Sequence, residues 1–490
     1  MLKLSRGQRR IVALLPALLA ALYFALLLPG GDTVALWKGA AVLSGCCALT
    51  LLLWKKRAPE TVFTVLMVCF GLFYIFAITP LSAPDEAAHL RAVLTLSSRL
   101  LRGDTVCDAA YLSTAGFTGH ENTAEAFTAL TQGLFTETLT GTMADFPAFE
   151  FTYPVMYFPQ TVGAVLAQLL GLNRLWLFVL GDLTNWLFYT AVIALAIRLI
   201  PRGKLPMAFS ALLPMSLQLC TSMSPDAFVT AMAYLFIALV VRAMERETPA
   251  RPGELICILL TGMLLSPAKA VYFLLLPLVA LIPGRRFGSG KRRAAFCAAV
   301  LAVAVVFTVL FQLPSFLRSA PAQADSENAF YSVSWVLTHI PQTAVMFIKT
   351  LIPSGIFDLI ESTLGTQLSG FTLQMVNGYL YAMLFMLLLL ALCGQDRDRP
   401  LRPAERGGFL LSSLLVLLAV MGTMLLNWTE VGEILIQGVQ GRYLIPVLPL
   451  LWLSMQNRAF HCDRDLAQPL TLGFTLAEWL CVNHILGHLA

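Results

Sequence analysis

The residues best suited to chemistry form an acidic cluster in which Asp85 and Glu86 follow Pro84, with His89 and Arg91 one helical turn further on. Of two adjacent carboxylates, one can act as a general base while its neighbour positions a substrate hydroxyl. The same two acids also suit the first turn of a helix that begins near Pro84, where they would cap the free N–H groups. The residue types alone leave both interpretations open.

A second acid, Asp226, stands in the sequence Ser-Met-Ser-Pro-Asp at 222–226, between two apolar stretches. Its simplest role is to cap the helix that follows. It nevertheless falls on the same predicted side of the membrane as Asp85 and Glu86. Acids from two separate loops on one face could therefore converge on one polar substrate.

Basic residues with similar potential are Lys269 and Arg442. Arg442 follows Gln440 and precedes Tyr443 in the sequence Gly-Val-Gln-Gly-Arg-Tyr at 438–443. An arginine holds a phosphate through paired donors of fixed geometry, and Lys269 interrupts an apolar stretch where it must reach water or an anion. The alternative for both is a side chain that reaches the lipid headgroups, with Tyr443 in the aromatic belt.

Other polar groups carry weaker signals. Asp182 and Asn185 lie one turn apart within an apolar stretch, where interhelical hydrogen bonding is the favoured role. The ten cysteines show no CxxC or Cys/His spacing, so neither a disulfide framework nor a zinc site is predicted.

The elements that must position these residues are membrane helices. Of the 490 residues, 58% are hydrophobic and 12% charged, against about 25% charged in soluble domains, and the mean hydropathy is +0.76. This composition excludes a large soluble enzyme, a disordered chain and a nucleic-acid-binding protein. We expect an all-α polytopic membrane protein with about 11 to 13 spans of roughly 20 residues each. The clearest candidates are 11–29, 35–54, 61–79, 175–199, 205–221, 227–243, 294–313, 374–393, 409–427, 443–456 and 470–487, with a broken stretch at 254–283.

The positions of Lys and Arg predict the orientation, because positive charge collects in cytoplasmic loops. Placing the basic clusters inside puts the N-terminus in the cytoplasm and makes 80–174 a large first external loop. Alternation of the spans then requires that 154–172 and 335–357 do not cross, and both are expected to lie in the membrane interface.

The motifs together resemble those of a known family. Pro84-Asp85-Glu86 with His89, the Tyr-Pro…Tyr-x-Pro-Gln…Gly pattern at 153–163, Ser-Pro-Asp at 224–226, Trp-Thr at 428–429 and Gly-Val-Gln-Gly-Arg-Tyr at 438–443 occur in order. They look like the bacterial membrane proteins grouped as domain of unknown function 2142, over about residues 60 to 456. Ala83 and Leu90 depart from the family pattern, which has a further Pro and an aromatic there.

That family is similar in layout to the C-type (GT-C) glycosyltransferases, which implies a GT-C-like bundle whose first external loop carries interfacial helices. The resemblance implies an enzyme that transfers a sugar from a polyprenyl-phosphate carrier to a glycan or glycolipid acceptor on the extracytoplasmic face of the plasma membrane, with inversion. It makes Asp85 the catalytic base, with Glu86 beside it, and assigns substrate binding to His89, Arg91, Asp226, Lys269, Gln440, Arg442 and Tyr443.

The expected domains are an N-terminal transmembrane hairpin at 1–57, a catalytic membrane domain at 58–456, and a tail with a last helix at 457–490. No cofactor is expected to be required, although Asp85, Glu86 and Asp226 could bind Mg²⁺ or Mn²⁺. The alternative functions are a lipid or glycan flippase or transporter, which would favour polar residues near the midplane, and a polymerase or ligase of cell-surface glycans.

Overall fold

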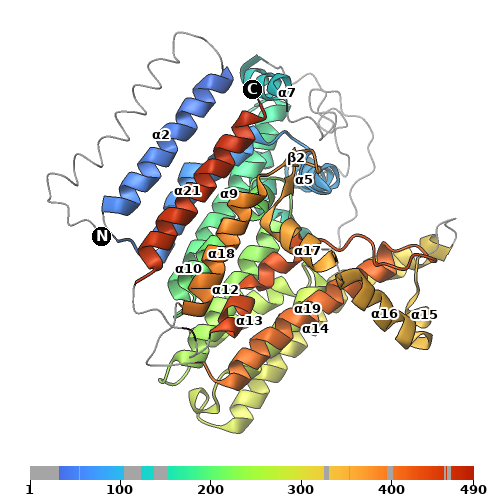
Figure 1. Cartoon of the computed structure of the whole chain (residues 1–490). Coiled ribbons are helices and arrows are strands. Elements are labelled where there is room, and N and C mark those ends of the chain that lie inside the picture. Colours follow the sequence, from blue (N-terminus) through green and yellow to red (C-terminus); the bar gives the residue numbers. More distant parts are fainter. Residues whose placement is uncertain are drawn as a thin grey trace.

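The structure is a computed structural model that describes residues 33–54, 56–103, 123–136, 153–324, 330–352, 354–393, 401–456, 460 and 465–489. Within these ranges the chain is helical apart from one two-stranded hairpin (Figure 1). The elements, with η2 a π-helix and the other η segments 3₁₀ helices, are α2 (Thr33–Trp54), α3 (Pro59–Leu66), η2 (Met67–Gly71), α4 (Leu72–Ala77), α5 (Glu86–Arg102), α7 (Ala124–Thr136), η4 (Pro154–Tyr157), α8 (Phe158–Leu169), α9 (Arg174–Leu199), α10 (Lys204–Ser210), α11 (Pro214–Cys220), α12 (Asp226–Glu245), α13 (Pro252–Leu265), η5 (Ala270–Leu281), η6 (Gly284–Arg286), α14 (Gly290–Ala324), α15 (Val333–Thr338), α16 (Ile340–Leu351), α17 (Gly355–Leu364), β1 (Gln367–Leu368), β2 (Leu373–Gln374), α18 (Asn377–Cys393), α19 (Pro403–Asn427), η7 (Gly441–Val447), α20 (Leu448–Met455) and α21 (Ala467–Gly487).

Long apolar helices place the protein in a lipid bilayer, as the composition predicts. Six segments of the described chain are long and apolar enough to cross a membrane: α2, the run from α3 to α4, α9, α12, the first part of α14, and α19. The α16–α17 pair, bent by 57°, makes a seventh if it counts as one span. The multi-pass, all-α prediction is therefore confirmed.

Within the described residues, fewer helices are long enough to cross a membrane than the 11 to 13 spans expected for the whole chain. Four further apolar helices, α13, η5, α18 and the η7–α20 run, are only 10–17 residues long. The expected span at 205–221 is divided into α10 and α11 at Pro214, because proline lacks an N–H and clashes with the preceding turn. The expected span at 11–29 lies outside the described residues.

The centre of the bundle is α12, which packs against α9 and α13. Apolar residues occur on all sides of α12, a pattern typical of a fully buried helix, and 89% of its apolar segment is buried. In α14 only 11% of the apolar segment is buried, so the apolar surface of this helix faces outward. Near the chain ends, α2 packs against α21, and the indole of Trp479 donates a hydrogen bond of 3.0 Å to the Ala41 carbonyl.

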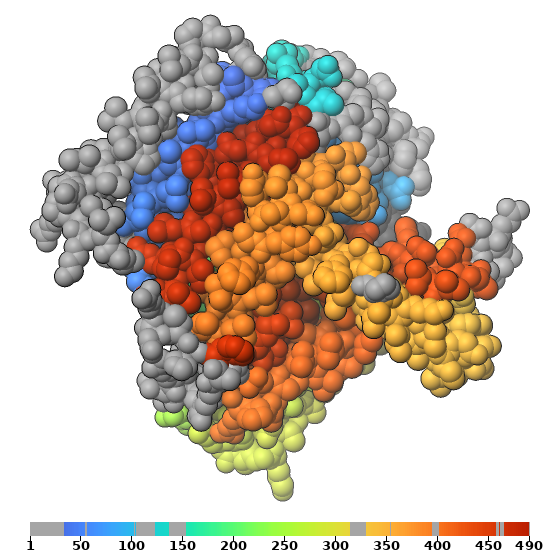
Figure 2. Space-filling view, viewed as in Figure 1, coloured from blue at the N-terminus to red at the C-terminus, as the bar shows by residue number. Residues whose placement is uncertain are grey.

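The two stretches expected to lie in the interface form short helices. Residues 154–172 form η4 and α8, and α8 packs on α9. Residues 335–357 contribute to α15, α16 and the start of α17, and α15 and α16 project from the side of the bundle (Figures 1 and 2). The broken stretch at 254–283 forms two short helices, α13 and η5, as its length predicts.

Candidate active site

The acidic motif lies in a strained turn between α4 and α5. Leu81 and Asp85 have φ angles of 67° and 60°, in the left-handed region, which costs a residue with a side chain about 1–2 kcal/mol. Asp85 occupies the N-cap position of α5, but its side chain makes no capping hydrogen bond. Its carboxylate is 61% exposed and accepts a hydrogen bond of 2.9 Å from Arg442 instead.

Glu86 has the opposite environment. Its side chain is buried, and its carboxylate accepts hydrogen bonds of 2.9 Å from the backbone N–H groups of Ala83 and Met223. Burial raises the pKa of Glu86 to about 7, although the backbone donors favour its charged form. The residue therefore joins the acidic turn to the loop before α12, and the two adjacent acids have different surroundings.

Asp226 begins α12 and forms an ion pair with Lys269 at the start of η5. Two buried amides fix the loop that carries Asp226. Gln160 of α8 donates a hydrogen bond of 2.9 Å to the Ser224 carbonyl, and Asn185 of α9 donates one of 2.8 Å to the Ser222 carbonyl. Asn185 thus has the structural role that its sequence position favours.

Arg442 joins the two acidic residues. Its buried guanidinium lies 2.9 Å from the Asp85 carboxylate and 4.0 Å from the Asp226 carboxylate. It also donates a hydrogen bond of 3.0 Å to the Tyr443 hydroxyl. The Lys269 ammonium lies 4.9 Å from the centre of the Tyr443 ring, within cation–π range. Two cations and two carboxylates from four separate segments therefore form one cluster.

The backbone before Arg442 is held against α17. The Gly441 N–H donates a hydrogen bond of 2.8 Å to the Ser362 hydroxyl, and the Thr363 hydroxyl donates one of 3.1 Å to the Gly441 carbonyl. A Cβ at Gly441 would lie 2.2 Å from the Leu359 carbonyl oxygen, so this close approach requires glycine.

Beside the cluster, His89 of α5 contacts the Tyr157 hydroxyl through Nδ1 at 2.9 Å. Burial lowers the pKa of His89 to about 4, so the imidazole is neutral at physiological pH. This contact joins the acidic motif to the Tyr-Pro-Gln motif of 153–163. Arg91, two residues further along α5, is not among the described residues that line the site cavity.

A cavity of about 830 Å³ opens against this cluster, within the size range of small-molecule sites. Asp85, Glu86, Gln440 and Arg442 line it, whereas Asp226, Lys269 and Tyr443 lie behind Arg442. The lining residues that the sequence did not single out include Gln218, Ser369 and Phe371. Gln218 could have been noticed in the sequence as a lone amide in an apolar stretch. Nothing in the sequence distinguishes Ser369 and Phe371, which lie in a loop.

The three acids that could bind a divalent cation all have other partners. Asp85 bonds to Arg442 and Asp226 to Lys269, while Glu86 accepts backbone N–H groups. No group of three or more His, Cys, Asp or Glu residues within the described ranges has the arrangement of a metal site. This set of partners does not fit a divalent cation.

Comparison with known proteins gives one match. Searches of the curated proteins and of the solved structures found none. The model of the family described as "Predicted membrane protein (DUF2142)" matches residues 68–451, which include the acidic turn, the Asp226 loop and the Arg442 segment. The match covers more than half of the chain, and we conclude that the protein belongs to the DUF2142 family of membrane proteins.

Proposed function

We propose that the protein is a membrane glycosyltransferase with a GT-C-like layout, which transfers a sugar from a polyprenyl-phosphate carrier to a glycan or glycolipid acceptor. The observation that carries the proposal is the pairing of an exposed carboxylate, Asp85, with a buried guanidinium, Arg442, in the wall of one cavity. Such a pair offers a base and an anion-binding group within the reach of one substrate.

Asp85 is the better base of the two adjacent acids. Its carboxylate is exposed to the cavity, whereas both oxygens of Glu86 are engaged by backbone N–H groups. A general base must come within hydrogen-bond reach of the proton that it removes. We therefore assign Asp85 as the base and Glu86 as a positioning residue that holds the acidic turn.

In the proposed reaction, the carrier phosphate binds Arg442 and displaces Asp85 from it. The freed carboxylate removes the proton from an acceptor hydroxyl, whose oxygen attacks the anomeric carbon. The bond between that carbon and the phosphate oxygen breaks, and the lipid phosphate leaves with the negative charge. Arg442, supported by Lys269, stabilises this charge where it develops, and the single displacement inverts the anomeric configuration.

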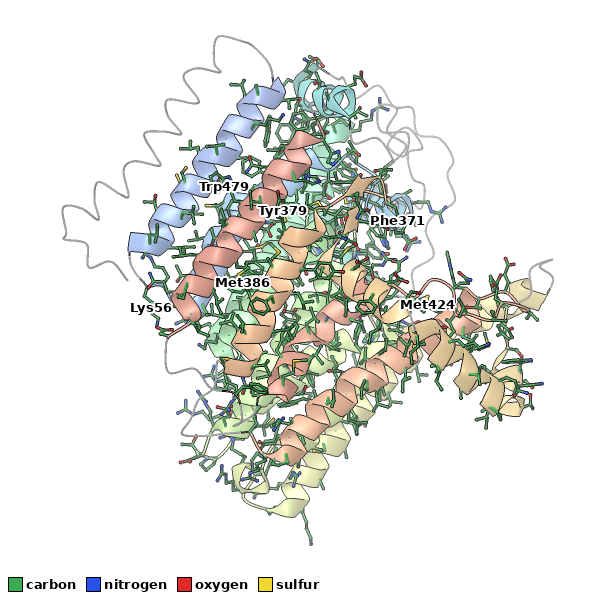
Figure 3. The ribbon with its side chains drawn as sticks, in the orientation of Figure 1. Lys56, Phe371, Tyr379, Met386, Met424 and Trp479 are labelled. Atoms are coloured by element: carbon green, nitrogen blue, oxygen red, sulfur yellow. The ribbon has the colours of Figure 1, made fainter. Side chains whose placement is uncertain are left out.

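Two features support a lipid-linked donor on the extracytoplasmic side. The site is built on apolar helices, so a lipid carrier can reach it from the bilayer. Lys56, in one of the basic clusters expected in the cytoplasm, lies at the lower end of α2 in Figure 3, whereas the cavity residue Phe371 lies nearer the upper end of the bundle. The positive-inside rule then favours an external cavity and a cytoplasmic N-terminus.

The test is a transfer assay in proteoliposomes with radiolabelled polyprenyl-phosphate sugars as donors and a membrane glycolipid extract as acceptor. The variants are Asp85→Asn and, as a matched control, Asp465→Asn. Asp465 is an exposed carboxylate whose surface ion pair with Lys56 contributes little. We expect the wild type and Asp465→Asn to move label to a new product, and Asp85→Asn to lose at least a hundredfold in rate, as removal of a general base implies.

Two outcomes would overturn the proposal. Equal transfer by Asp85→Asn and wild type would remove Asp85 from the chemistry. If the wild type moved no sugar from any donor but translocated a labelled lipid across the vesicle membrane, the flippase alternative would replace the transferase.

A further inference from the structure

A second part of the cavity wall has no role in the proposed displacement. It consists of the hairpin formed by β1 and β2, with its turn at Ser369, Gly370 and Phe371, together with Gln218 of α11. The hairpin is antiparallel, with Gln367 opposite Gln374 and Leu368 opposite Leu373. Figure 3 shows Phe371 higher in the bundle than Lys56, which lies at the lower end of α2.

The backbone of this turn is strained. Ser369 and Phe371 have φ angles of 50° and 72°, a left-handed conformation that is unusual for serine and an outlier for a bulky residue. Across the described chain, the non-glycine residues with positive φ are these two together with Leu81 and Asp85, and all four line this cavity. Strained residues persist where the surrounding structure holds them and cluster at ligand-binding sites, so the hairpin turn has the same signature as the acidic turn.

The strained turn carries an exposed aromatic ring. Phe371 is 70% exposed, although it lines the cavity. Folding gains little from an exposed phenyl ring, because the hydrophobic gain depends on the apolar area that is removed from water. The ring therefore provides an apolar face that a ligand can cover.

The wall of the same cavity also contains polar groups without partners. Gln218 is 2% exposed, and neither its amide oxygen nor its amide nitrogen has a hydrogen-bond partner within the described structure. The Ser369 hydroxyl is also buried and without a partner there. A buried polar group without a partner costs about 1–3 kcal/mol, and a ligand that both donates and accepts hydrogen bonds would remove that cost.

The charges in this part of the wall indicate which ligand it suits. Asp358 and Glu361 of α17 line the cavity, and their negative charge disfavours a phosphate here. Glu361 accepts a hydrogen bond of 2.6 Å from the Tyr381 hydroxyl, which shows that it can accept from a hydroxyl donor. The wall therefore combines an aromatic face, an amide, a hydroxyl and carboxylate acceptors.

We propose that the β1–β2 turn and Gln218 form a subsite for a neutral sugar ring, in which Phe371 covers the C–H face of the ring and Gln218 bonds to its hydroxyls. The C–H groups of a sugar carry partial positive charge that is attracted to the negative face of an aromatic ring. Its hydroxyls both donate and accept hydrogen bonds, which matches the amide of Gln218. This inference rests on the proposed function for the source of the sugar, which is either the donor or the acceptor.

The test measures binding without transfer. A panel of methyl glycosides is titrated against the purified full-length protein by saturation-transfer difference NMR. We expect at least one glycoside to bind the wild type, and Phe371→Ala to weaken its affinity about three- to tenfold. Gln218→Leu, which removes the donor and the acceptor at similar volume, should weaken it to a similar extent. The matched control is Phe385→Ala, which removes a phenyl ring that is 60% exposed on α18 and not among the residues lining this cavity.

A second readout separates a binding role from a structural one. Phe371→Gly removes the ring and also relieves the left-handed strain, so its thermal midpoint should equal or exceed that of the wild type while glycoside affinity falls. In the transfer assay, a raised KM for the donor alone or for the acceptor alone identifies which sugar occupies the subsite.

Three results would overturn this inference: no binding of any glycoside by the wild type, equal affinity in Phe371→Ala and Phe385→Ala, or a loss of affinity in Phe371→Gly that follows a loss of stability. Each leaves the Asp85 transfer assay unaffected. Conversely, glycoside binding by a wild type that transfers no sugar would remove the proposed function and leave the subsite.

Discussion

At the scale of single residues, Arg442 shows why residue type matters in this site. One buried guanidinium lies 2.9 Å from Asp85 and 4.0 Å from Asp226. A lysine would keep the charge but lose the planar group whose several donors can serve more than one oxygen. The position therefore requires both the charge and the shape of arginine.

We expect Arg442→Lys to lower kcat/KM for the donor by about tenfold or more, and Arg442→Gln by about a hundred- to a thousandfold, because removal of a charge-stabilising donor has that effect. Steady-state transfer at saturating acceptor measures the change. Arg406→Lys is the matched control. Arg406 is a partly buried arginine that donates a hydrogen bond of 3.0 Å to the Ser454 carbonyl, and it does not line the cavity. Wild-type kinetics in Arg442→Lys would contradict this role.

A second residue-scale prediction concerns Glu86, whose pKa is raised from 4.5 to about 7. The unfolded chain releases this proton at lower pH than the folded protein does, so the stability contributed by protonated Glu86 is lost as pH rises from about 4.5 to 7. Relative to Glu86→Gln, the wild type should lose up to about 3 kcal/mol across this window. Thermal unfolding of both proteins at several pH values measures the difference.

The low pKa of His89 changes the stability of the fold in the opposite direction. The stability contributed by neutral His89 is lost as pH falls from about 6.5 to 4. His89 is present in both proteins, so its contribution cancels in the comparison. A gap between wild type and Glu86→Gln that did not change with pH would show that Glu86 does not titrate in this range.

At the scale of elements, α17 and η7 act as one support for the cationic part of the site. Two hydrogen bonds, from Thr363 to the Gly441 carbonyl and from the Gly441 N–H to Ser362, fix the start of η7, and Arg442 follows directly. A short 3₁₀ segment interrupted by Pro446 has few internal hydrogen bonds of its own. Its position therefore depends on the neighbouring helix.

We expect Gly441→Ala to destabilise the protein by about 1–3 kcal/mol, as overpacking does, and to reduce transfer by displacing Arg442. The new Cβ would lie 2.2 Å from the Leu359 carbonyl oxygen, where backbone has to move. Gly422→Ala is the control, because nothing lies within 4 Å of its added Cβ in α19, and alanine there should stabilise the helix slightly. Thermal midpoints in detergent compare the two, and equal midpoints would contradict the close packing.

At the scale of the whole molecule, the proposed orientation places the cavity outside the cell and Lys56 inside it. Single cysteines at positions 433 and 465, in a background without native cysteines, test this arrangement. Both positions are exposed, and they lie respectively in the external and cytoplasmic segments of the proposed topology. A membrane-impermeant maleimide should label position 433 in intact cells and position 465 only after permeabilisation. The reverse pattern would place the cavity in the cytoplasm.

Much of this architecture could be predicted from the sequence. Hydropathy indicates the apolar helices, and the motif residues Asp85, Asp226, Lys269 and Arg442 do lie in one cluster. The division of the stretch 205–221 into two short helices could not be obtained in this way, because Pro214 divides an apolar stretch without changing its hydropathy. The different surroundings of Asp85 and Glu86 depend on backbone N–H groups, one of them at Met223 in a distant loop, and every residue except proline carries such a donor.

The contact between Asp85 and Arg442 also has a consequence for biogenesis. The two residues are 357 positions apart, so at about 5–20 residues per second the ribosome adds the arginine roughly 20 to 70 s after the aspartate. Throughout that interval the acidic turn lacks its counter-ion. Assembly of the pair waits until Arg442 has been synthesised, and under the proposed function a chain that stops before this residue holds the base without the cation for the donor phosphate.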